Sequence, residues 1–242
     1  MSKSLKLFLG ISYLIILFFF LYLIFSYIEI TRLNDFFYYK DLQSRLENII
    51  GQNFYFNLLL FFLFSIIWVA LLGFGSPLLI VSGILFGKWV GSIISVFAIS
   101  IGALILYSIA NFFFKDLIKN LLNKKFSKYL DLFKKNEFYY FLIFRLTGGL
   151  GIPFGLQNLL PIIFNIKKSN YFFGSFLGFI PTFFIMNSIG SGLNEFIKQA
   201  DSFSIINLIL NEEIYLPLSF FFLILIISIF VRKRVFNVKD SE

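Results

Sequence analysis

The sequence predicts an all-helical integral membrane protein, in which a re-entrant hairpin plus a transmembrane helix occurs twice as an inverted repeat, flanked by N- and C-terminal transmembrane helices. Hydrophobic residues form 59% of the chain and charged residues only 14%, whereas soluble domains carry about 25% charged residues. The apolar runs 7–28, 54–72, 90–114 and 216–231 are too long and too poor in charge for ordinary core helices. Finally, the tripeptide Gly-x-Pro interrupts two apolar stretches.

The two interruptions, at 75–77 and 151–153, predict broken helices inside the membrane. Proline removes a backbone donor and clashes with the preceding helical turn. In hydrocarbon every freed backbone group needs another partner, so a broken segment persists only where protein or water covers it. A glycine follows each copy at the same distance, Gly102 and Gly178. Such paired interruptions point to a transport site near the bilayer midplane.

Residues 1–30 are expected to form the N-terminal transmembrane helix. Lys3 and Lys6 precede the apolar run 7–28, which exceeds the ~7–15 residues of a signal-peptide core, and no cleavage site of small residues follows it. We therefore expect an uncleaved helix, followed at 31–53 by an extracytoplasmic amphipathic segment.

Loop charges predict the orientation. The net charge is zero for 31–53, +4 for 112–137, −3 for 191–213 and +2 from 232 to the end. Because cytoplasmic loops carry an excess of Lys and Arg, both termini and the 112–137 linker are expected in the cytoplasm, with the protein in the cell (inner) membrane.

The first half, 54–111, must then cross the membrane an odd number of times. It is too long for one helix, and two helices would end on the wrong side. A re-entrant hairpin at 54–88 that enters from outside, followed by one span at 90–111, satisfies both conditions. The alternative is three ordinary spans with a kink in each half.

The second half, 138–190, repeats the pattern from the cytoplasmic side, with a hairpin at 138–166 and a span at 170–190. An extracytoplasmic loop at 191–213 and a C-terminal transmembrane helix with a basic tail at 214–242 complete the chain. The two halves are thus expected to be related as in many transporters.

The basic linker 112–137 predicts an amphipathic helix over 115–135. Lysines fill the positions between apolar residues that recur at spacings of three and four: Leu117, Leu121, Leu122, Phe126, Tyr129, Leu130 and Phe133. Such a helix lies in the membrane surface and attracts anionic lipid. The alternative is a loop helix packed on neighbouring protein.

Arg145 is the most informative single residue. It lies inside an apolar segment, and no acidic residue occurs in 54–114 or 138–194. An unpaired charge in hydrocarbon costs on the order of 2.5–3.5 kcal/mol or more, so Arg145 lies at a wet hairpin mouth or has a ligand. A guanidinium suits bidentate contact with a lipid phosphate, and the adjacent glycine-rich turn could present N–H groups to an anion. The alternative is an arginine that snorkels to the interface near Glu137.

Other polar or flexible residues accompany the two interruptions. Gln157 and Asn158 follow Pro153, where their amides could bind a headgroup or satisfy backbone groups freed by the break. In the first half, Lys88 is the only charge between 54 and 114. It would mark the outer mouth of the first hairpin, or simply anchor the interface beside Trp89.

Residues between about 70 and 195 also follow a known pattern: Pro77, Gly83, Phe86-Gly87 and Gly91, then Phe144-Arg145-Leu146, Pro153-Phe154-x-x-x-Asn158, Asn170-Tyr171, Gly174, Gly178, Pro181 and Gly190. This pattern resembles the VTT domain, the membrane family of SNARE-associated Golgi proteins and DedA-like bacterial proteins. The resemblance implies two facing re-entrant helices. It also implies movement of lipids between leaflets, either phospholipid scrambling or flipping of undecaprenyl phosphate or phosphatidylethanolamine.

Two departures from the family pattern matter. The spacing between Arg145 and Pro153 is longer than in the usual run, with glycines where a proline is expected. The membrane-embedded acids of DedA proteins are also missing, which argues against proton-coupled transport by their mechanism.

These observations favour transport over catalysis. With no histidine or cysteine and no carboxylate pair in the apolar segments, we expect no enzyme activity, cofactor or metal site. The net charge of +8 lies in loops and ends, so no nucleic acid is expected.

The leading hypothesis is a lipid transporter or scramblase for anionic or phosphate-bearing headgroups, with homo-oligomerisation left open. The alternatives are a small-solute or ion transporter and a non-transporting assembly factor. Candidate substrate-binding residues are Arg145, Pro153, Phe154, Asn158, Gly149, Gly151, Pro77, Gly83, Gly87 and Lys88.

Overall fold

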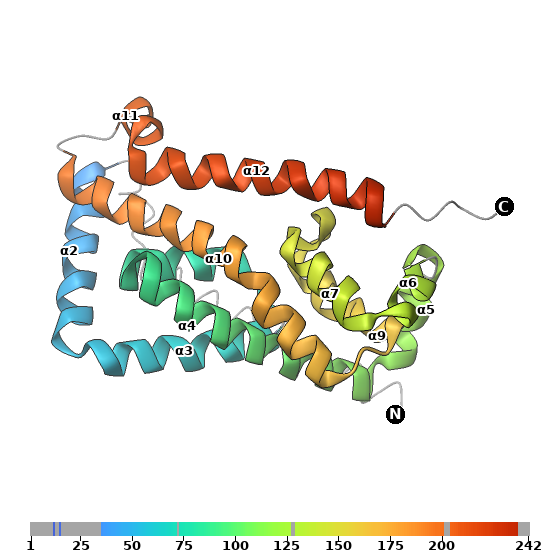
Figure 1. The fold of residues 1–242 in the computed structure, drawn as a ribbon. Coiled ribbons are helices and arrows are strands. Elements are labelled where there is room, and N and C mark those ends of the chain that lie inside the picture. The colour runs from blue at the N-terminus through green and yellow to red at the C-terminus, as the bar shows by residue number, and fades with distance from the viewer. Residues whose placement is uncertain are drawn as a thin grey trace.

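The computed structural model describes residues 35–71, 73–126, 129–200 and 204–236, together with positions 12 and 15, and every regular element in this part of the chain is helical (Figure 1). Apart from those two helical positions, the predicted helix at 1–30 lies outside the described residues. The elements are α2 (Phe36–Gln52), α3 (Phe54–Ala70), α4 (Gly75–Phe113), α5 (Lys115–Phe126), α6 (Leu130–Lys135), α7 (Glu137–Leu146), the 3-10 turn η3 (Gly148–Gly151), α8 (Phe154–Leu159), α9 (Pro161–Phe164), α10 (Lys168–Gln199), α11 (Ile205–Leu210) and α12 (Glu212–Val235).

Helices α4, α10 and α12 are each long and apolar enough to cross a membrane, and within the described residues only the bent pair α2–α3 adds a fourth candidate. That pair bends by 106° between its two helices. Only 11% of the most apolar window of α12 is buried in the protein, which leaves a long apolar surface uncovered, as expected for a helix that faces lipid. The chain is therefore a multi-pass membrane protein, as its composition predicts.

The chain reverses direction at Gly87, inside α4. Gly87 has φ +73° and ψ 173°, a conformation that is essentially restricted to glycine. Ser82 donates a hydrogen bond of 3.1 Å from its Oγ to the carbonyl of Gly91. In a straight helix residues nine apart would lie about 13.5 Å from each other along the axis. Residues 75–86 and 88–113 are therefore two separate arms, and the bend is a reversal, in contrast to the kinked-span alternative.

The arm 75–86 and α3 form the two sides of one short hairpin. Phe54 begins α3 and Phe86 ends the returning arm, and their rings are 6.0 Å apart between centroids. The start and the end of the hairpin thus lie at the same level. Residues 54–86 therefore form a helical hairpin in the structure.

The second half contains a comparable excursion, made of α7, η3, α8 and α9. Glu137, the first residue of α7, accepts hydrogen bonds from the side chain of Asn170 and from the backbone N–H of Lys167, the latter at 3.4 Å. Asn165, which has φ +51°, turns the chain between α9 and α10. The segment 137–167 therefore also returns to the level at which it began.

The turning points of the two excursions touch each other. A Cβ atom placed at Gly75, at the start of α4, would lie 3.4 Å from the ring of Phe154, at the start of α8. The longer arm of α4, residues 88–113, also packs closely against α10. Rings of Phe97 and Phe176 are 4.8 Å apart, and those of Tyr107 and Tyr171 are 4.4 Å apart.

Helix α2 runs across the ends of the longer helices and not alongside them (Figure 1). Lys198 near the end of α10 forms a 2.9 Å ion pair with Glu47 of α2, and Lys40 donates to the carbonyl of Ala200 at 3.1 Å. These contacts fix the amphipathic α2 as a surface helix at one end of the bundle.

Two elements differ from their predicted extents. Helix α10 continues to Gln199, beyond the predicted end at 190, and two glycines permit close packing along this added length. A Cβ atom at Gly190 would lie 2.2 Å from the carbonyl oxygen of Ile80, and one at Gly192 would lie 2.3 Å from that of Glu213.

The linker forms two helices, α5 and α6, on either side of residues 127–128. Phe133 stacks on Phe164 of α9 at 4.0 Å, as the packed-helix alternative expects. Leu117 and Leu121 remain exposed, so part of the apolar face is free for a membrane surface.

Candidate functional site

The guanidinium of Arg145 lies in the protein interior. Arg145 occupies the last turn of α7, where helix carbonyls favour a positive charge, and only 1% of the residue is exposed. The snorkelling alternative is therefore wrong for this structure. Its proposed neighbour, Glu137, binds Asn170 and the backbone of Lys167 instead.

Three neutral side chains accept hydrogen bonds from Arg145. Its Nη2 donates to Asn158 Oδ1 at 2.8 Å and to the hydroxyl of Tyr171 at 3.1 Å, and its Nη1 donates to Gln157 Oε1 at 3.4 Å. No carboxylate of the described residues forms an ion pair with this guanidinium. The charge is thus solvated by amides and a phenol but not neutralised.

Aromatic rings surround the remaining faces of the guanidinium. Its central carbon lies 4.7 Å from the ring centroid of Phe179, 5.0 Å from that of Phe141 and 5.6 Å from that of Tyr171. Rings within about 6 Å attract a cation electrostatically, and more strongly when water is excluded. The rings therefore offset part of the cost of burying the charge.

Two buried donors in this group have no partner in the described structure. They are Arg145 Nε and the amide nitrogen of Asn158. A buried donor left unsatisfied costs about 1–3 kcal/mol, and more when it is charged. Arg145 and Asn158 are neighbours, because Nη2 of the arginine donates a hydrogen bond to Oδ1 of the asparagine. The two unpartnered donors, Nε of Arg145 and the amide nitrogen of Asn158, therefore lie on adjacent side chains. Both suit a ligand that is rich in hydrogen-bond acceptors.

The glycine-rich turn η3 positions Gln157 beside Arg145. Gln157 donates to the carbonyls of Ile152, at 2.6 Å, and Gly148, at 3.1 Å. Gly149 has φ +73°, and a Cβ atom there would lie 2.1 Å from the side chain of Gln157. The backbone conformation favours glycine at this position, and a side chain there would displace the amide of Gln157 from its place beside Arg145.

Tyr171 is held in place by a second tyrosine. Its ring stacks on Tyr107 of α4 with centroids 4.4 Å apart and planes 15° apart. The Tyr107 hydroxyl donates to the carbonyl of Ile166 at 2.5 Å, and the Tyr171 hydroxyl donates to that of Asn158 at 3.3 Å. The position of the Arg145 acceptor is therefore set by α4 as well as by α10.

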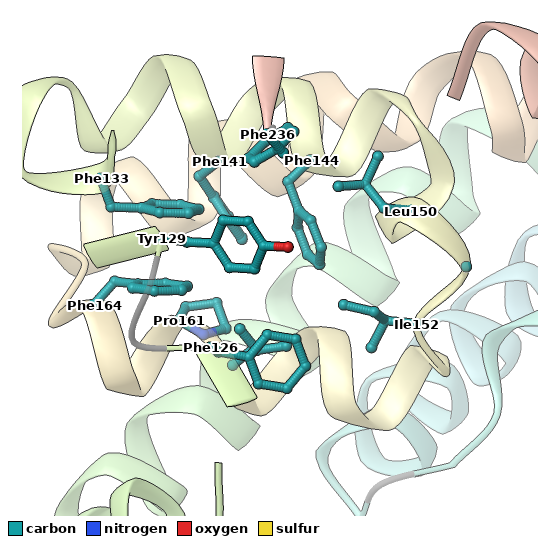
Figure 2. A pocket seen from close by; sticks show the side chains of 12 residues that line it. Phe126, Tyr129, Phe133, Phe141, Phe144, Leu150, Ile152, Pro161, Phe164 and Phe236 are labelled. Carbon is teal, nitrogen blue, oxygen red and sulfur yellow. The ribbon is translucent and has the colours of Figure 1, made fainter. Parts of the chain in front are cut away.

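An aromatic cavity of about 380 Å³ lies on the other side of Phe141 and Phe144, which the sequence did not indicate (Figure 2). Its size falls within the usual range of about 300–1,000 Å³ for ligand pockets. The cavity is lined by Phe126, Tyr129, Phe133, Phe141, Phe144, Leu150, Gly151, Ile152, Leu160, Pro161, Phe164 and Phe236. Because Phe141 also contacts the guanidinium, one side chain separates the cavity from the buried charge.

Of the five other predicted site residues of the second half, only Asn158 contacts Arg145 directly. Asn158 bonds to it directly and Gly149 supports Gln157, as given above. Phe154 contacts Phe179 at 6.0 Å, Pro153 precedes the first turn of α8, and Gly151 lines the cavity with φ +80°.

The four predicted residues of the first half lie elsewhere. Gly87 forms the reversal, and a Cβ atom at Gly83 would lie 2.1 Å from the carbonyl oxygen of Asn187. Pro77 is exposed in the first turn of α4. Lys88 forms a 3.4 Å ion pair with Glu213 of α12. These residues shape the first hairpin and its surroundings but do not touch the buried arginine network.

Sequence reasoning missed the parts played by Tyr171, Tyr107, Phe141 and Phe179. A signal for Tyr171 existed, because Tyr171, Gly174 and Gly178 recur at spacings typical of one helix face. No sequence signal singled out Phe141 or Phe179, because the chain contains 38 phenylalanines.

Together the fold and the site define a multi-pass helical membrane protein with a buried, hydrogen-bonded arginine near the turning points at Gly75 and Phe154, which touch each other. The sequence profile of the VTT domain family matches residues 72–192, which is half of the chain. The chain therefore belongs to this family, the superfamily of DedA and SNARE-associated Golgi proteins. The match covers the turning points at Gly75 and Phe154 and every candidate residue of the site. No solved structure shows significant similarity to the chain. Within the described residues, no group of three or more acidic side chains is placed to hold a metal ion.

Proposed function

We propose that this protein moves phosphate-bearing lipids between the two leaflets of its membrane. The observation that carries the proposal is the buried Arg145, which has no carboxylate partner among the described residues and whose own Nε is, with the amide nitrogen of Asn158, one of two unpartnered donors. A carboxylate partner would make the arginine a purely structural ion pair. Neutral acceptors leave its positive charge available to an anion.

A phosphate group fits the chemistry of these donors. It supplies several anionic oxygens, and arginine binds such oxygens with paired, charge-assisted hydrogen bonds. The Nε of Arg145 and the amide of Asn158 would both be satisfied by it. Gln157 and Tyr171 already hold the Nη atoms, so the guanidinium is oriented before the ligand arrives.

The proposed path runs between two opposed re-entrant hairpins, 54–86 and 137–167, arranged as an inverted repeat. Support comes from the contacts that close each hairpin at its own end, Phe54 with Phe86 and Glu137 with Asn170. The contact of Gly75 with Phe154 supports tips that meet inside the bilayer. Hairpins that stop at the midplane thin the apolar barrier that a headgroup has to cross.

In this arrangement the lipid tails stay in the bilayer, and only the headgroup enters the protein. The strongly exposed apolar surface of α12 supports continuous contact with acyl chains. The scarcity of intramembrane polar residues favours lipid over solute, because a tail needs no polar lining. Gly83, Gly87 and Pro77 would shape the first hairpin, while Pro153, Phe154, Gly149 and Gly151 would shape the second.

We place the protein in the cell (inner) membrane with both termini in the cytoplasm. The +4 linker at 112–137 supports this orientation under the positive-inside rule. Hairpin 137–167 and Arg145 would then be entered from the cytoplasmic side.

Leaflet exchange in liposomes tests the proposal. Purified protein is reconstituted, and the exchange of fluorescent anionic and zwitterionic phospholipids is compared with protein-free vesicles. The variants are Arg145→Gln and, as a matched control, Arg45→Gln. Arg45 is a surface arginine with a 72% exposed side chain, paired only with Asp41 in the described structure.

We expect exchange by the wild-type protein and by Arg45→Gln, and at least a tenfold slower rate for Arg145→Gln, which corresponds to about 1.4 kcal/mol of lost phosphate binding in the rate-limiting state. Equal rates for both variants would contradict the role of Arg145. Absence of exchange in a folded wild-type protein would contradict lipid transport and favour a solute or an assembly role.

A further inference from the structure

A second candidate binding site lies on the outside of the bundle, away from Arg145. It is a groove of about 590 Å³ between α4, α10 and α12. No residue of the arginine network lines it. Its walls are mostly apolar, and one end carries three charged side chains: Lys88, Glu212 and Glu213.

The apolar part of the groove opens toward the lipid-facing surface. Trp89 is 66% exposed, Phe220 57% and Leu223 50%, and all three line the groove. These residues belong to helices that are long and apolar enough to span the membrane. An occupant that covers them therefore has to be hydrophobic along most of its length.

The ion pair at the charged end of the groove is long and exposed to the surroundings. Lys88 and Glu213 are 3.4 Å apart, with 39% and 51% of their side chains exposed. Glu212, in the first turn of α12, is exposed and has no side-chain partner in the described part of the chain. The three groups together carry one positive and two negative charges.

We infer that this groove binds one zwitterionic phospholipid. The phosphate would lie at Lys88 and the ammonium group at Glu212 and Glu213, so that the headgroup takes the place of the exposed ion pair. One acyl chain would then run along Trp89, Phe220 and Leu223. Phosphatidylglycerol, which is anionic and has no ammonium group, meets a net negative end, which disfavours it.

This preference is opposite to that expected from the whole chain. The protein has a net charge of +8 and would attract anionic lipid in general. A local preference for zwitterionic lipid at the groove is therefore a specific signature, and it does not depend on leaflet exchange at Arg145.

Trp89 provides a reporter at the groove itself. The chain contains two tryptophans, Trp68 and Trp89, so Trp68→Phe leaves Trp89 as the only one. Its fluorescence is measured in bilayers that contain a small fraction of brominated phosphatidylcholine or the same fraction of brominated phosphatidylglycerol. Bromine quenches tryptophan only at short range, so the ratio of the two signals measures local lipid preference.

The Glu212→Gln/Glu213→Gln double variant removes the acidic end, and Asp131→Asn serves as a control. Asp131 is an exposed acid of α6 that pairs with Lys134, outside the groove. We expect phosphatidylcholine to quench Trp89 roughly two- to fivefold more strongly than phosphatidylglycerol, the range for partly exposed charge pairs. The preference should disappear in the double variant and persist in the control.

Equal quenching by the two lipids, or a preference for phosphatidylglycerol, in the Trp68→Phe protein would overturn the inference. So would a preference that survives the double substitution. If the double variant does not fold, the single variant Glu212→Gln tests the same lipid preference. Glu212 has no side-chain partner to lose in the described part of the chain, and its substitution should still reduce the preference for phosphatidylcholine.

Discussion

Gly178 of α10 lies directly against Arg145 of α7. A Cβ atom at position 178 would stand 2.3 Å from the Cβ atom of Arg145, and 3.3 Å from its backbone. The first distance is far shorter than any van der Waals contact allows, and a Cβ atom cannot swing away as the end of a flexible side chain can. The position of the buried guanidinium therefore depends on the absence of a side chain at 178.

Gly178→Ala should displace α7 and destabilise the protein. Overpacking of this kind typically costs about 1–3 kcal/mol, and we expect a clear fall in the apparent Tm of the detergent-solubilised protein. Gly51→Ala is the matched control, because a Cβ atom there meets nothing within 4 Å. An unchanged Tm for Gly178→Ala would contradict the close packing of α7 on α10.

Gly87 is expected to be sensitive for a different reason. Nothing lies within 4 Å of a Cβ atom at this position, but φ is +73° with ψ 173°. Side chains of any size are disfavoured in that region, at a cost of about 1–3 kcal/mol. Gly87→Ala and Gly87→Asn should therefore lower the Tm by similar amounts. A tolerant Gly87→Asn would indicate an ordinary left-handed residue in place of the reversal described above.

Asn158→Asp should separate stability from transport. The substitution places a carboxylate 2.8 Å from Nη2 of Arg145, in the position of the present amide oxygen. The resulting ion pair satisfies the arginine internally and removes the free amide donor. We expect unchanged or higher Tm but slower leaflet exchange, by at least about tenfold if the phosphate loses ~1.4 kcal/mol of binding.

The control for that variant is Asn207→Asp on the exposed surface of α11, which should change neither quantity. Normal exchange by a stable Asn158→Asp protein would show that the positive charge of Arg145 is not used by the substrate.

The ion pair between Glu47 and Lys198 should make a small, pH-dependent contribution. Hydrogen bonds from Lys198 and then from Gln43 lower the pKa of the Glu47 carboxyl below its ordinary value of 4.5. Because the folded pKa is depressed, the stabilisation is present above pH 4.5 and is lost as the pH falls through the lowered pKa.

Glu47→Gln should thus lower the Tm slightly at neutral pH and not at all in strong acid. The carboxylate side chain is 57% exposed, so the effect should not exceed about 1 kcal/mol. A Tm difference of equal size at both pH values would rule out the charge of Glu47 as its cause.

The sequence predicted the membrane class and both chain interruptions, and it singled out Arg145 and Asn158, whose side chains form a hydrogen bond in the structure. Gly-x-Pro, uninterrupted apolar runs and an arginine without nearby acids are local properties of the chain, and the position of Asn158 followed from the motif after Pro153. The reversal at Gly87 was expected only as part of a hairpin, because no local signal distinguishes a glycine at a bend from one at a helix contact.

The rest depends on contacts between distant segments. Tyr107 reaches Tyr171 only because α4 and α10 pack along their lengths, and Lys88 meets Glu213 across 125 positions of sequence. The aromatic cavity arises where several short helices fail to fill the space between them. In a chain with 21% aromatic residues, no pattern marks which rings line a cavity.

Contact between Arg145 and lipid phosphate is the central claim, and solid-state NMR tests it most directly. Dipolar coupling is measured between isotope-labelled arginine side-chain nitrogens and lipid phosphorus in proteoliposomes, for the wild-type protein, Arg145→Lys and Arg45→Lys. The account predicts a coupled arginine Nε signal that disappears in Arg145→Lys and remains in Arg45→Lys. Identical coupling in wild-type and Arg145→Lys proteins would show that no lipid phosphate binds the buried arginine, and would contradict the account.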